Sequence, residues 1–195
     1  MLTLYILGHT FHYELENLCR LFFPDEKLVR KNELPPEPGG DHILTRVSRE
    51  GPGTLLLEAG LQIGGARLFD AARQSLEGEP DAESERVLAV LLFGLLAAHC
   101  GSRPKWGILT GVRPAKLMGT LLRTHGEAAA AEYFTEKLLV SPGKTRLAME
   151  AAKAAEIAAL GLSPRSFSLY ISVPFCPTRC AYCSFISHSA PAALR

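Results

Sequence analysis

The sequence has almost no net charge and no apolar run of membrane-spanning length, and both absences exclude classes of protein. Its 195 residues include 21 lysines and arginines and 20 aspartates and glutamates, so the net charge is +1. A chain so balanced offers no overall excess of charge for nucleic acid or for an anionic membrane surface. The most apolar run, residues 87–98, is shorter than the roughly 20 residues that a membrane helix needs. We therefore expect neither nucleic acid nor a membrane as a partner.

Targeting and disulfide signals are missing as well. The N-terminus lacks the pattern of a secretory signal peptide, and the chain has only five cysteines. Disulfides belong to oxidising compartments, so these cysteines are expected to be reduced. There is no internal repeat. We expect a cytoplasmic protein, and 47% hydrophobic residues are enough for a real core.

Hydrophobic periodicity predicts an α+β N-terminal region followed by a helical segment. Alternation and turn residues predict strands at residues 2–7, 42–49, 54–59 and 66–70, with a loop at residues 31–41. Helical spacing predicts helices at residues 13–23, 81–100, 115–124, 126–139 and about 143–160. The expected domains are a small α+β domain (1–75), a helical segment (81–162) and a third part (166–195).

Single residues on these elements have simple interpretations. Cys19 shares the apolar face of its helix with Leu15 and Leu18 and is expected to be a buried small hydrophobe. His9 has no obvious partner and is expected to be a surface or loop histidine. In the last helix, a stripe of small and apolar residues is expected to pack against another helix: Leu147, Ala151, Ala154 and Ala158.

Three cysteines lie close together near the end of the sequence. Cys176, Cys180 and Cys183 have the spacing C-x3-C-x2-C and follow an aromatic and β-branched run, residues 167–173, that is typical of a strand. Pro174 cannot donate to a sheet ladder and is expected to end that strand. The thiols are therefore expected on a loop at the C-terminal end of a strand, where α/β folds place reactive groups.

Such a set of thiols is a soft metal site, and the residues alone leave alternatives open. Three thiolates can hold three irons of a cubane cluster and leave the fourth iron open. A zinc site is also chemically possible if His188 joins them, as C-x3-C-x2-C-x4-H. Disulfides within the loop would leave one thiol unpaired.

The same residues carry a family resemblance. The pattern C-x3-C-x-aromatic-C, with Tyr182 as the aromatic residue, resembles the signature of the radical S-adenosylmethionine (SAM) enzymes. Residues 170–185 look like the branch of oxygen-independent coproporphyrinogen III oxidases, and they are most similar to its HemZ-type coproporphyrinogen dehydrogenases. Residues 106–114, Trp-Gly-Ile-Leu-Thr-Gly-Val-Arg-Pro, also resemble that group.

The resemblance implies a fold. Radical SAM enzymes surround the cysteines with a partial (β/α) barrel of about six strand–helix units, by analogy with full barrels. We therefore expect the chain to lead into the first strand of a truncated radical SAM partial barrel. We also expect it to be an N-terminal fragment that has no turnover alone.

The resemblance also implies cofactors and a reaction. The three cysteines would hold a 4Fe-4S cluster, and SAM would chelate its open iron. Phe175 and Tyr182 would bind the cofactor, and Tyr170 would take a catalytic position near SAM and substrate. An electron from an unidentified donor would cleave SAM, and the resulting 5′-deoxyadenosyl radical would abstract hydrogen from a propionate side chain. Loss of carbon dioxide, twice, turns coproporphyrinogen III into protoporphyrinogen IX in haem synthesis.

The sequence departs from the family pattern at two places, so the resemblance implies the class of reaction more strongly than it implies the substrate. Ser172 stands where better-known relatives have a histidine, and Ser184 with Phe185 stands where they often have a fourth cysteine. The alternatives are a haem-binding chaperone of the same branch and a zinc-stabilised binding module. Tyr170 also has an alternative interpretation as a half-buried strand tyrosine.

The segment at residues 106–114 has its own expectations. Gly107 is expected where the backbone needs unusual angles or a close approach, and Trp106 is expected in the core. Arg113 precedes a helix and opposes its dipole. We therefore expect it to have an acidic partner, either a protein carboxylate or a bound anion such as a substrate propionate.

Overall fold

The computed structural model describes residues 1–76, 80–110, 113–163, 165–167, 169–176 and 188–189. They belong to two compact units, Met1–Ile157 and Ala158–Arg195, and each unit is described by itself.

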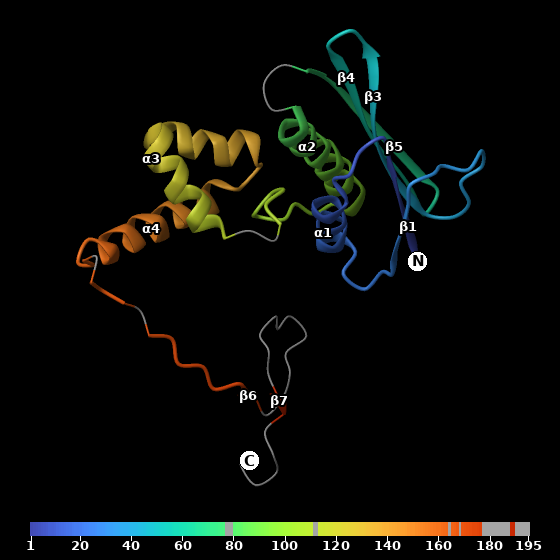
Figure 1. Ribbon diagram of the computed structural model, residues 1–195. Helices are drawn as coiled ribbons and strands as arrows, with labels where there is room; N and C mark the ends of the chain where they lie inside the picture. The colour runs from blue at the N-terminus through green and yellow to red at the C-terminus, as the bar shows by residue number, and fades with distance from the viewer. Residues whose placement is uncertain (77–79, 111–112, 164, 168, 177–187, 190–195) are drawn as a thin grey trace. The chain divides into compact units, whose positions relative to one another are not determined.

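A five-stranded mixed sheet forms the N-terminal part of the first unit, in the order β2-β1-β3-β4-β5 (Figure 1). β1 (Leu2–Leu7) runs parallel to both of its neighbours, β2 (Leu28–Lys31) and β3 (His42–Gly51). Five of its six residues are buried, which is the pattern of a strand covered on both faces. The expected strand at residues 2–7 is confirmed, whereas β2 was not expected from the sequence.

β3, β4 (Thr54–Ile63) and β5 (Ala66–Ser75) form two successive antiparallel hairpins. The second hairpin turns at Gly64 and Gly65, whose φ angles are +58° and +83°. Positive φ at both central residues matches the right-handed twist of the flanking strands and favours glycine. The three expected strands are confirmed, and the structure extends each of them.

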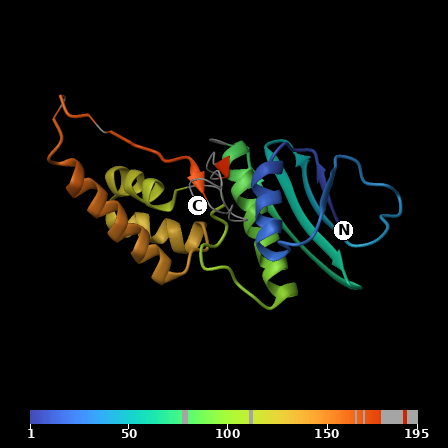
Figure 2. The ribbon, with the colours of Figure 1, turned by 90° about the horizontal axis from the view of Figure 1, so that it is seen from below.

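Two helices cover the same face of the sheet (Figure 2). α1 (His12–Phe22) buries Leu15, Leu18 and Cys19, so the predicted helix and its apolar face are confirmed. α2 (Pro80–Cys100) buries Leu88, Leu92, Phe93 and Leu96 in the same core. We expected a domain boundary between residues 75 and 81. The apolar α2 lies beyond that boundary but packs in the same hydrophobic core as the sheet. The sheet and α2 therefore share one core.

A second hydrophobic core lies among the helices that follow. α3 (Pro114–Glu132) continues into a π-helical turn, η1 (Tyr133–Lys137), and α4 (Pro142–Ala159) packs beside them. Gly126 interrupts α3 with φ +82° and ψ 174°. It divides α3 at the point where the sequence predicted one helix to end and the next to begin.

The packed face of α4 differs from the predicted stripe. Thr145, Ala148 and Ala152 are buried, whereas Leu147 is 47% exposed and Ala151, Ala154 and Ala158 are exposed. In an alanine-rich helix more than one small-residue stripe has helical spacing, so the sequence alone did not identify the packed one.

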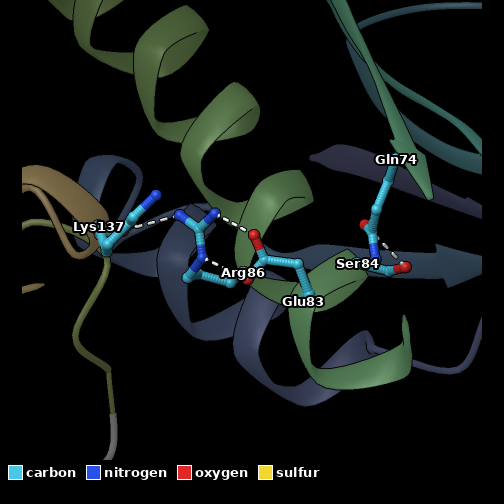
Figure 3. Close-up of polar contacts among 5 residues, drawn as sticks. All are labelled: Gln74, Glu83, Ser84, Arg86 and Lys137. Carbon is cyan, nitrogen blue, oxygen red and sulfur yellow. Dashed lines mark hydrogen bonds and ion pairs between the residues drawn. The ribbon is translucent and has the colours of Figure 1, made fainter. Parts of the chain in front are cut away.

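Polar contacts fix α2 at its N-terminal end (Figure 3). The Ser84 hydroxyl donates to Gln74 Oε1 of β5 at 3.1 Å, and the Arg86 guanidinium donates to both carboxylate oxygens of Glu83. Arg86 Nη1 also donates to the carbonyl oxygen of Lys137 in η1 at 3.1 Å. One helix therefore contacts both the sheet and the second core.

The second unit has little regular structure among its described residues. We expected a strand at residues 167–173, but residue 167 and residues 169–173 have no regular secondary structure. A β-branched, aromatic composition suits a strand but does not supply the partner strand that its backbone groups need. The described strands there are β6 (Phe175–Cys176) and β7 (His188–Ser189), which pair in parallel. In the described part of the chain, no helix is both long and apolar enough to cross a bilayer.

Candidate functional site

The cysteine segment begins on β6. Cys176 pairs in register with Ser189, and Phe175 pairs with His188. The Cys176 thiol is free and only partly exposed. Cys180 and Cys183 lie outside the described residues, so the structure does not test whether the three thiols meet.

The aromatic residues of the candidate site are accessible where they are described. Tyr170 is 79% exposed and Phe175 is 45% exposed, so Tyr170 is not the half-buried strand tyrosine of the alternative interpretation. Tyr182 lies outside the described residues. The cofactor-binding and catalytic assignments of these three residues stay predictions.

The chemistry of the donors can be judged from the described cysteines. Among the residues that the structure describes, no three histidine, cysteine or acidic side chains group as metal ligands. Cys19 is fully buried, and burial raises the pKa of its thiol to about 12, which makes it a poor source of thiolate. Cys176 has neither a disulfide nor full burial to prevent it from binding a soft metal. Its chemistry therefore fits the thiolate set that the sequence motif predicts.

The loop before α3 makes a close backbone contact with the segment after η1. The Ile108 amide donates to the Leu138 carbonyl oxygen at 3.0 Å, and the Ser141 amide donates to the Lys105 carbonyl oxygen at 3.0 Å. Gly107 has φ +58°, and a Cβ there would stand 2.1 Å from the Leu138 oxygen. The predicted close approach at Gly107 is confirmed.

The neighbouring residues of this loop have a mixed outcome. Trp106 packs, partly buried, against the second core, as expected. Arg113 is exposed, and it forms no ion pair with another residue of the described ranges. The first of the two expected partners, a protein carboxylate, is therefore not found for Arg113 among the described residues. The bound anion stays a prediction.

His9 has a structural role that the sequence did not reveal. Its Nδ1 accepts a hydrogen bond from the Phe11 amide at 3.3 Å, and its Nε2 contacts the Thr45 hydroxyl at 3.1 Å. Because Nδ1 is an acceptor, the proton of the neutral ring lies on Nε2 and is donated to Thr45. His9 lies in a loop, as expected, and Thr45 and the Phe11 amide are the partners that the sequence did not reveal. His9 lies two residues after the end of β1, and no local pattern points to Thr45, which is 36 residues away.

The comparisons with known proteins agree with the motif. The likeness lies with the oxygen-independent coproporphyrinogen oxidase-like proteins. The chain is 30% identical over 190 residues, 91% of its length, to the oxygen-independent coproporphyrinogen-III oxidase-like protein HemZ of Bacillus subtilis (strain 168). The resemblance to HemZ-type proteins that the sequence indicated is thus confirmed. The chain spans 36% of the length of this relative. No family model and no solved structure matches the chain.

Proposed function

We propose that this chain is part of a radical SAM oxidoreductase that converts coproporphyrinogen III to protoporphyrinogen IX by oxidative decarboxylation in haem biosynthesis. The observation that carries the proposal is a coincidence of two signals. The C-x3-C-x2-C set occurs in a chain whose likeness to a coproporphyrinogen-III oxidase-like protein covers 91% of its length. A zinc-binding loop alone gives no reason for a likeness over 190 residues.

Cys176, Cys180 and Cys183 would hold the 4Fe-4S cluster in this proposal. Three thiolates satisfy three irons and leave one coordination site for SAM. Once bound, the cluster and SAM supply the one-electron chemistry that the reaction requires. Cys176 is suited to this role because its thiol is free and partly accessible.

The remaining site residues would bind and orient. Phe175 and Tyr182, beside and between the cysteines, would pack against SAM and exclude water. Tyr170 would face SAM and substrate, and its 79% exposure leaves its surface available for such contacts. Arg113, exposed and without a described carboxylate partner, is a candidate to bind a substrate propionate.

The test is an anaerobic count of iron and sulfide after reconstitution of the chain. We expect about four irons and four sulfides per chain, which are lost in Cys180→Ala. The matched control is Cys100→Ala, which removes a free thiol of α2 outside the motif and should keep the cluster.

The opposite result is also specific. One tightly held zinc without sulfide, released by His188→Ala, would mean a structural Cys3His loop, and the haem-pathway proposal would be abandoned. A three-thiolate cluster should survive His188→Ala, because that cluster does not use the imidazole.

A further inference from the structure

Two adjoining hollows lie where the loop before α3 meets the first turn of α4. Their volumes are about 500 and 380 Å³, and both are lined by Lys105 and Ser141. Because they share this wall, we treat them as one cationic groove, lined by Arg103, Lys105, Lys144 and Arg146.

The groove has more positive than negative charge. Its four cations stand against two carboxylates, Glu136 and Glu150, in a chain whose total net charge is +1. Six ion pairs occur among the described residues, and none of them includes a groove cation. The local excess is therefore not neutralised by the described part of this chain.

Aromatic rings hold two of the cations in place. The Arg103 guanidinium carbon lies 5.1 Å from the centroid of the Phe93 ring, and Lys144 Nζ lies 5.3 Å from that of Trp106. The face of an aromatic ring attracts a cation. Unlike a carboxylate, the ring does not neutralise the charge and has no oxygen to accept the cation's hydrogen bonds. Arg103 and Lys144 are thus positioned while their donors stay available to an anion.

The first turns of α4 add to the positive potential. No acidic residue lies in the first turn of this helix, whereas Lys144 and Arg146 lie near its N-terminus. The helix dipole is positive at that end, so cations there are unfavourable without a nearby anion. An anionic ligand in the groove would relieve this repulsion.

The backbone beneath the groove is firmly held. The Ser141 amide donates to the Lys105 carbonyl oxygen at 3.0 Å, and Leu139, two residues before Ser141, has a φ of +58°. Leucine rarely adopts positive φ, so this conformation persists because the surrounding contacts impose it. A site on a fixed backbone loses less entropy when it binds a ligand.

We propose that the cationic groove binds an acidic segment of a partner polypeptide. Its cations are spread over two adjoining hollows, which suits several carboxylates on one chain better than a single oxyanion. Glu136 and Glu150 in the same walls would repel the unbroken charge of a nucleic acid backbone, whereas a peptide can place neutral residues there. Pro104, Pro142 and Leu147 offer such residues apolar contacts. The inference uses none of the cysteine chemistry and stands independently of the proposed reaction.

The experiment measures binding of a fluorescently labelled glutamate-rich peptide to the chain by anisotropy, at low and at raised salt. Trp106, the single tryptophan of the sequence, reports on the groove through its emission. The groove variant is Lys105→Gln with Arg146→Gln. The matched control is Lys116→Gln with Arg123→Gln, an exposed lysine and arginine of α3 that do not line the groove.

We expect the groove variant to bind the peptide about tenfold more weakly, which corresponds to about 1.4 kcal/mol, and the control to bind as the unchanged chain does. Equal weakening by both variants would indicate unspecific attraction and overturn the proposal. So would the absence of binding. An oligonucleotide that binds more tightly than the peptide would assign the groove to nucleic acid, and inorganic phosphate that displaces the peptide at equal concentration would assign it to a single oxyanion.

Discussion

Arg86 of α2 and Lys137 of η1 join the two hydrophobic cores of the first unit through one hydrogen bond, from Arg86 Nη1 to the Lys137 carbonyl oxygen at 3.1 Å (Figure 3). The Arg86 side chain is only 16% exposed and is also held by Glu83. A guanidinium can do both at once because its donors form a planar fork. Ile108 packs against both cores as well, so the contact has apolar as well as polar parts.

The first prediction follows from this contact. Arg86→Met should lower the free energy of unfolding by about 1–3 kcal/mol, because it leaves the Lys137 carbonyl and the Glu83 carboxylate without their charged donor. The measurement is urea unfolding followed by circular dichroism. Arg73→Met is the control, since Arg73 makes a similar fork to Glu50 on the exposed surface of β5. An equal loss in both variants would show that the position of Arg86 between the cores has no special weight.

The second prediction concerns the close approach at Gly107. Gly107→Ala should destabilise the chain by more than about 2 kcal/mol, because a Cβ there meets the Leu138 carbonyl oxygen at 2.1 Å. Gly64 is a matched control, as it has the same φ of +58° with nothing within 4 Å of the added atom. Gly64→Ala should cost only the backbone strain of about 1–2 kcal/mol. If both alanines cost the same, the backbone of residues 138–139 moves aside and the contact is not rigid.

Sequence periodicity predicted those elements whose pattern is long enough to be distinctive. α1 repeats an apolar face over its 11 residues, α2 contains a long apolar run, and β3, β4 and β5 are separated by glycine-containing turns. β2 has only four residues, too few for a pattern to appear. Residues 167–173 have the composition of a strand, but a strand also needs a pairing partner, which composition does not provide.

The candidate site also has features that the sequence could predict and features that it could not. The spacing of Cys176, Cys180 and Cys183 could be recognised because metal ligation depends on residues close in sequence. The contact of His9 with Thr45 and the grouping of Arg103 with Arg146 depend on the tertiary structure. No local pattern predicts which distant side chains the fold will bring together.

The third prediction is a pH dependence of stability. Burial lowers the pKa of His9 from 6.5 to about 4, and the Phe11 amide, which donates to Nδ1, leaves no acceptor there for a second proton. Between pH 6.5 and about 4, His9 is therefore protonated in the unfolded chain but neutral in the folded chain. A lower pH then favours the unfolded state. Stability should be constant above pH 6.5 with respect to His9 and should fall between pH 6.5 and about 4.

The measurement for His9 is the urea midpoint at several pH values across that window. His9→Gln should be less stable at neutral pH, because it disturbs the contact with Thr45, but it should lose the part of the slope that belongs to the imidazole. A slope that is the same in both proteins would mean that other groups cause the pH dependence.

The fourth prediction compares two cysteines as reagents and connects the fold with the proposed cluster. Cys19 is fully buried with a pKa of about 12, whereas Cys176 is free and partly exposed. Thiolate reactivity needs both deprotonation and access. In the folded chain, iodoacetamide should therefore modify Cys176 and leave Cys19 unmodified, and peptide mass mapping can separate the two. In urea both should react, which confirms that Cys19 is protected by the fold.

If the cysteine motif holds a cluster, anaerobic reconstitution should then protect Cys176 without changing Cys19. Rapid labelling of Cys176 after reconstitution would mean that its sulfur is not a ligand, and the assignment of this cysteine to the cluster would fail.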